Sequence, residues 1–147
     1  MSDIPDLTAH TGYLLRMVSN AVSQKFARDV EGEGVTVAEW AMLRSLYGSD
    51  ATTPSDLVRK MGMTKGAISK LADRLLDKGL IARTGSNRGQ SLSLSPAGAQ
   101  RVPILAALAD QNDAAFFTVL SGEEHKQLRD LLHGLIKTHG LTTMPVD

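Results

Sequence analysis

The segment from Thr64 to Gly98 carries side chains whose types and spacing suit contact with DNA. It reads TKGAISKLADRLLDKGLIARTGSNRGQSLSLSPAG. Hydroxyl and ammonium groups on the polar face of a predicted helix can bond to base edges or phosphates, and a glycine there lets the backbone come close. The candidates on this helix are Thr64, Lys65, Gly66, Ser69, Lys70 and Arg74. We also assign Thr53 and Ser55, at the start of the preceding helix, to the DNA-binding set.

Two further candidates lie in the polar stretch from Thr84 to Gln90. Asn87 and Arg88 stand at the expected tip of a β-hairpin, next to a glycine. A long cation at such a tip can enter a narrow minor groove. A merely solvated arginine is the alternative, but a recognition helix beside the tip favours the DNA contact.

The charge of this region supports the same interpretation. Residues 53–90 contain eight Lys or Arg and three Asp, a net charge of +5, whereas residues 1–52 carry −3 and residues 91–147 carry −2. Because DNA attracts proteins through its phosphates, a local basic region matters more than the zero net charge of the chain. An ordinary solvated basic helix is the alternative for this segment taken alone.

Caps and apolar spacing predict the elements that position these residues. We expect a mainly α protein with a small β-hairpin, that is, a winged helix-turn-helix flanked by terminal helices. The predicted helices are 7–30, 37–46, 54–61 and 65–78, then one starting at Ser95-Pro96 with a kink near Pro103, and one starting at Ser121. The predicted strands are 80–83 and 91–95.

Composition excludes several classes of protein and site. The chain has 147 residues, 42% of them hydrophobic, and no cysteine, which fits one globular domain without disulfides or thiolate metal sites. The four histidines lack the i, i+4 spacing of a helical metal site. We find no phosphate loop, nucleophile elbow, membrane span or signal peptide. We therefore expect a cytoplasmic protein that is not an enzyme and that needs no cofactor or metal.

The terminal helices hold more apolar residues than a small winged domain can cover. We expect them to form a homodimer, which would place two recognition helices on a two-fold symmetric site in double-stranded DNA. Packing of the same leucines within one chain is the alternative. The expected division is 1–34 as a dimerisation helix, 35–98 as the DNA-binding lobe and 99–147 as dimerisation helices.

Nearly the whole chain resembles the MarR (multiple antibiotic resistance regulator) family of bacterial transcription factors. The matching pieces are GYLLRMVSNAV, TVAEWAMLRSLYG, SDLVRKMGMTKGAISKLADRLLDKGLIART and LSPAG. The resemblance implies a homodimeric repressor on a pseudo-palindromic operator, often released by a small aromatic or phenolic effector. The family's wing commonly has Asp-x-Arg; here Ser86 replaces the aspartate while Arg88 is kept.

A candidate effector site rests on helix faces and on this family habit. An arginine can pair with a carboxylate and a ring can stack on an aromatic ligand. The residues are His10, Tyr13, Arg16, Trp40 and Arg44. The alternative for Tyr13 and Trp40 is that they are core residues.

The alternative function for the whole protein is a winged domain that binds another protein, without sequence-specific DNA binding.

Overall fold

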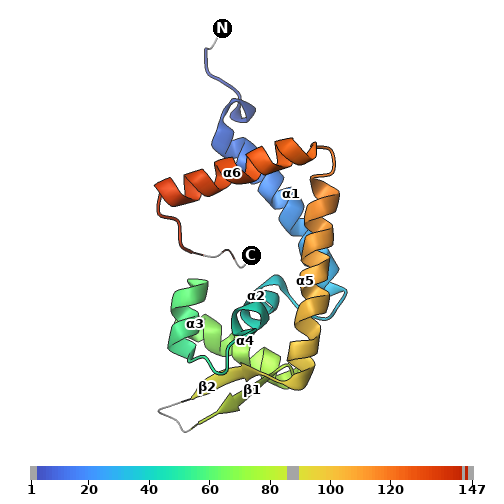
Figure 1. Cartoon of the computed structure of the whole chain (residues 1–147). Helices are drawn as coiled ribbons and strands as arrows, with labels where there is room; N and C mark the ends of the chain where they lie inside the picture. The colour runs from blue at the N-terminus through green and yellow to red at the C-terminus, as the bar shows by residue number, and fades with distance from the viewer. Residues whose placement is uncertain (1–2, 86–89, 144, 146–147) are drawn as a thin grey trace.

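The computed structural model describes residues 3–85, 90–143 and 145. Two long helices stand side by side above a smaller lobe that ends in a β-hairpin (Figure 1). The elements are η1 (Leu7–Ala9), α1 (Thr11–Glu31), α2 (Val37–Leu46), α3 (Pro54–Met61), α4 (Lys65–Asp77), β1 (Ile81–Thr84), β2 (Ser91–Leu94), α5 (Pro96–Phe116) and α6 (Gly122–Thr138). The predicted fold class is confirmed.

Local capping chemistry starts most of these helices where the sequence predicts. In α2 the Thr36 hydroxyl accepts from the Glu39 amide while the Glu39 carboxylate accepts from the Thr36 amide, and α3 and α6 begin with equivalent boxes. Ser95 caps α5, and its hydroxyl accepts from the Gly98 amide. Each box satisfies backbone donors that a helix start leaves unpaired.

Some predicted boundaries differ from the structure. The first predicted helix is divided, because His10 is extended (φ −101°, ψ 127°) and separates η1 from α1. Strand β1 begins one residue later than predicted, at Ile81, because Leu80 closes the α4 turn by donating its amide to the Leu75 carbonyl. Helix α5 runs from Pro96 to Phe116 and includes Pro103, and the kink expected near this residue stays a prediction.

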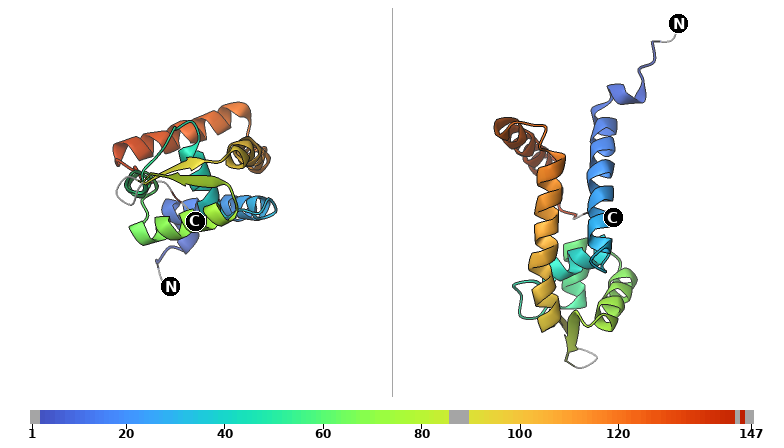
Figure 2. Two further views of the ribbon diagram at one scale, coloured as in Figure 1. Left: turned by 90° about the horizontal axis from the view of Figure 1, so that it is seen from below. Right: turned by 90° about the vertical axis from the view of Figure 1, so that its right-hand side faces the viewer.

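The core lies in the lobe, where α2, α3, α4 and the hairpin meet the lower ends of α1 and α5 (Figure 2). Leu43, Leu57, Ile68, Leu75 and Leu92 are fully or almost fully buried there. The hairpin is antiparallel, with Ile81 opposite Leu94, and Thr52 adds an isolated bridge to Leu92 that the sequence did not predict. This core fixes one face of α4 and leaves the other to solvent.

The upper half is much less covered. Helix α6 has no buried residue, and large apolar side chains are exposed on it and on α1. These residues are Leu14, Leu15, Met17, Val18, Leu131, Leu132, Leu135 and Ile136. No helix in the described part of the chain is long and apolar enough to cross a membrane.

Candidate nucleic-acid interface

Helix α4 presents the predicted polar face to solvent. Its cap is Thr64, whose hydroxyl accepts from the Ala67 amide at 3.1 Å and keeps its own hydrogen free to donate. Ile68, Leu71, Ala72 and Leu75 form the buried face of this helix, which leaves its polar residues on the solvent side. Thr64, Lys65, Gly66, Ser69, Lys70 and Arg74 are all exposed.

Three cations on this face are free to meet phosphates. Lys65, Lys70 and Arg74 have no acidic partner among the described residues. A Cβ added at Gly66 would meet no heavy atom within 4 Å, so packing does not require a glycine there.

The other described cations of residues 53–90 make ion pairs or hydrogen bonds within the chain. The net charge counted from the sequence does not show these contacts. Arg59 pairs with Asp56, Lys60 donates to the Ser45 carbonyl at 3.1 Å, Lys78 pairs with Glu39 and Arg83 lies 3.3 Å from Asp73. Among the described residues of this region, Lys65, Lys70 and Arg74 are the cations that make no such contact.

Helix α3 contributes the predicted residues Thr53 and Ser55, both exposed at its N-terminal end. Thr53 is the cap, so its hydroxyl already accepts from the Asp56 amide at 3.1 Å. Asn87 and Arg88, the predicted hairpin-tip contacts, lie outside the described residues. Strand β1 of the hairpin is linked to α4, because Arg83 on β1 pairs with Asp73.

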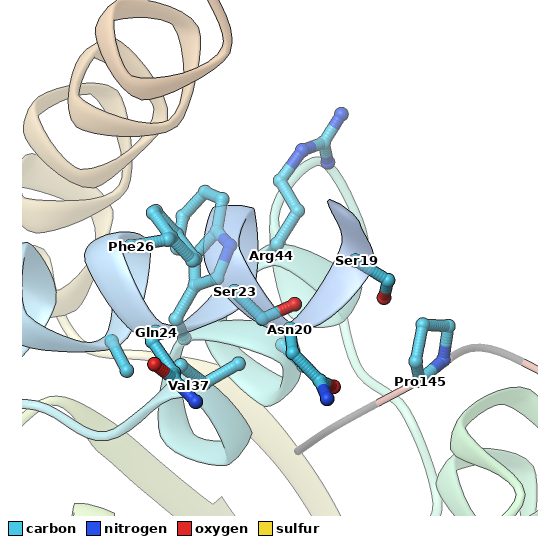
Figure 3. Close-up of a pocket in the computed structure, with 11 residues that line it drawn as sticks. Ser19, Asn20, Ser23, Gln24, Phe26, Val37, Arg44 and Pro145 are labelled. Carbon is cyan, nitrogen blue, oxygen red and sulfur yellow. The ribbon is translucent and has the colours of Figure 1, made fainter. Parts of the chain in front are cut away.

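A groove of about 660 Å³ opens between α1 and α2 (Figure 3). Trp40 and Arg44, two of the five predicted effector residues, line it, whereas His10, Tyr13 and Arg16 are not among its lining residues. The sequence did not predict the polar residues of α1 on the opposite wall, although their helical spacing places them on one face. They are Ser19, Asn20, Ser23 and Gln24, with Pro145 at the edge.

Three carboxylates have lowered pKa values for structural reasons. Burial raises the pKa of Glu39, but hydrogen bonds from Lys78 and Thr36 and the charge of Lys78 outweigh it. Hydrogen bonds from Thr53 lower the pKa of Asp56, and those from Ser121 lower the pKa of Glu124. All three belong to helix caps. Among the described residues, no group of three or more His, Cys, Asp or Glu could hold a metal ion.

A capped helix with an exposed basic face, packed beside a hairpin on a helical lobe, defines the winged-helix class of DNA-binding transcription regulators. The sequence profile of the MarR family matches residues 33–90, which include α2, α3, α4 and β1 and end just before β2. The chain belongs to the MarR family. It is therefore a DNA-binding transcription regulator. The members of this family are transcription regulators and not enzymes.

Individual relatives agree over most of the chain. The crystal structure of a probable transcriptional regulator from Pseudomonas aeruginosa has 30% identity and a TM-score of 0.77, with 89% of this chain and 100% of that one covered. The repressor MdtR of Bacillus subtilis is 27% identical, covering 75% of this chain and 64% of its own. The Mycobacterium tuberculosis repressor Rv2887 is 26% identical, covering 86% and 94%. Its structure with p-aminosalicylic acid covers 86% and 98%, with a TM-score of 0.70.

Proposed function

We propose that the protein is a homodimeric repressor that reads a pseudo-palindromic operator through α4. The observation that carries this proposal is the set of three exposed cations on α4, Lys65, Lys70 and Arg74, that have no acidic partner in the described part of the chain. Lys65 and Ser69 lie in the first two turns, where a helix in the major groove reaches bases. Residues 35–98 form the DNA-binding lobe, and Asn87 and Arg88 extend the contact to the minor groove.

The dimerisation part consists of residues 1–34 and 99–147. Support comes from the exposed apolar faces of α1 and α6, which a single copy leaves in water. Two-fold pairing of these faces would bring two copies of α4 to one side of a duplex. Bound to an operator that overlaps a promoter, such a dimer blocks transcription by occupying the site.

Substitution of α4 residues tests this proposal. Lys65→Ala and Ser69→Ala are each expected to weaken binding to an operator selected from random duplexes by about 1–3 kcal/mol, because each removes a contact to a base or phosphate. Lys25→Ala is the matched control: it removes the same charge from a half-exposed ion pair with Asp29 on α1, and its effect should be small. Operator affinity measured by fluorescence anisotropy checks all three. If both α4 variants bound like the wild type, the assigned interface would be wrong.

We further propose that a small aromatic acid binds the groove between α1 and α2 and releases the operator. The groove volume lies within the usual range for ligand sites, and Phe26, Val37 and Trp40 provide an apolar wall. Arg44 at the same groove can pair with a carboxylate. Rv2887, a related repressor, has been crystallised with p-aminosalicylic acid, an acid of this kind.

Titration with p-aminosalicylic acid tests the effector site. Trp40 is the only tryptophan in the chain, so a ligand stacked on it should change the protein's fluorescence. The same acid should lower operator affinity, and Arg44→Ala should weaken acid binding about tenfold or more, since hydrogen bonds to charged groups contribute about 1.5–3 kcal/mol. Arg28→Ala, an exposed arginine of α1 outside the groove lining, is the control. No change in fluorescence or in operator affinity would contradict the site.

A further inference from the structure

The turn between α1 and α2 is held by two cations that come from different elements. Lys78, the residue that ends α4, donates from Nζ to the Gly34 carbonyl at 2.8 Å and to Glu39 Oε1 at 2.9 Å. Arg101 on α5 donates to the Glu33 carbonyl, and its guanidinium lies 3.5 Å from the Glu33 carboxylate. Two consecutive carbonyls of one turn therefore join α4 to α5.

Glu39 makes the Lys78 contact difficult to replace. Its side chain is fully buried, with 0% exposed, and Oε2 has no partner among the described residues. Oε1 accepts from the Thr36 amide at 2.8 Å as well as from Lys78. Without the ammonium of Lys78, the carboxylate would remain as a buried charge with no opposite charge beside it. The turn would also lose its bond to Gly34.

The same end of α4 is attached directly to the start of α5. Ser95 donates from its hydroxyl to the Gly79 carbonyl at 2.6 Å, and its amide donates to the Leu80 carbonyl at 3.1 Å. A Cβ at Gly98 would overlap the Leu80 carbonyl oxygen, so the first turn of α5 lies directly against this loop. The C-terminal end of α4 is thus fixed at two places, in addition to the core packing of Ile68, Leu71 and Leu75 along the helix.

Helices α1 and α5 continue from this junction as a packed pair to the exposed apolar region above (Figure 2). A rotation of α4 against that pair would break the bonds of Lys78 to the turn, or those of the turn to Arg101. Neither cation is on the exposed face of α4 that carries Lys65 and Ser69. Their contribution to DNA binding would be indirect.

We propose that Lys78 and Arg101 are positioning residues, which set the angle of α4 relative to the α1–α5 pair and so the half-site spacing that the dimer accepts. This inference rests on the proposed dimeric operator binding. Half-site spacing follows from the separation and direction of two recognition helices. An added base pair turns one half-site relative to the other by about a tenth of a helical turn. A dimer whose α4 helices are rigidly held should bind this lengthened operator more weakly than the parent operator.

Spacing selectivity tests the proposal on the full-length protein. The probes are the selected operator and the same duplex with one base pair inserted between half-sites, measured well below the thermal midpoint of each variant. The wild type should prefer the parent spacing strongly. Lys78→Met is expected to bind the parent operator at least tenfold more weakly and to lose most of the spacing preference. Lys78→Arg keeps the charge and should retain the spacing preference of the wild type.

Two other variants keep the test decisive. Arg101→Met alters a half-buried surface contact and is expected to fold, and it should also relax the spacing preference. Lys25→Met removes an equal charge from α1 and should leave the preference unchanged. If Arg101→Met and Lys78→Met only lowered the thermal midpoint while keeping sharp spacing selectivity, these residues would be structural only. If the wild type itself selected no operator, the proposed function would fail instead.

Discussion

Leu135→Glu is expected to convert the proposed dimer into monomers and to remove tight operator binding. Leu135 belongs to the exposed apolar face of α6 and is 48% exposed in one copy, so the substitution costs the isolated chain little. In a two-fold dimer both copies lose a buried leucine, at about 1.5–3 kcal/mol each. The dissociation constant of the dimer should therefore rise about 10²- to 10⁴-fold. Sedimentation equilibrium measures this change directly.

The opposite face of α6 supplies the control. Lys126 and Asp130 form an exposed pair at 3.0 Å, on the side of the helix away from Leu135. Lys126→Glu places the same acidic side chain on this polar side and should leave the dimer intact. A Leu135→Glu protein that remained dimeric, with unchanged operator affinity, would show that α6 does not contribute to the interface.

The fold was predictable from sequence because its signals are local. Thr36 and Glu39 satisfy each other's backbone groups, so their spacing alone starts α2 correctly. The strict alternation of Ser91 to Leu94 likewise predicts a strand with one buried face. The divided first helix was missed because its apolar spacing continues across His10, where only the backbone angles change.

The candidate site was predicted less completely, since it depends on contacts between distant residues. Lys65 and Lys78 look equivalent in the sequence, yet one is exposed and without an acidic partner among the described residues, and the other is bonded to Gly34 and Glu39. Pairs separated by tens of residues leave no periodic signal. For the same reason the sequence placed Trp40 and Arg44 of α2 together but did not predict the polar residues of α1 that line the same groove.

Salt dependence is the second large effect that we expect. Each Lys or Arg that contacts a phosphate releases counterions, so the logarithm of affinity falls linearly with the logarithm of salt concentration. Two copies of Lys65, Lys70 and Arg74 and of the predicted contact Arg88 would neutralise about eight phosphates, within the range of about 6–10 that such proteins contact. Affinity should then fall about 10³- to 10⁵-fold between 50 and 200 mM salt.

The central claim is that the basic face of α4, doubled by symmetry, is the surface that binds DNA. A titration of the selected operator and a scrambled duplex with wild type and Lys70→Ala, across this range of salt, tests it most directly. We predict a steep slope for the wild type, a slope lower by about one for each lost contact in Lys70→Ala, and tighter binding to the operator than to the scrambled duplex. A shallow slope shared by both proteins, with no preference between the duplexes, would contradict the claim and would favour a winged domain that binds protein.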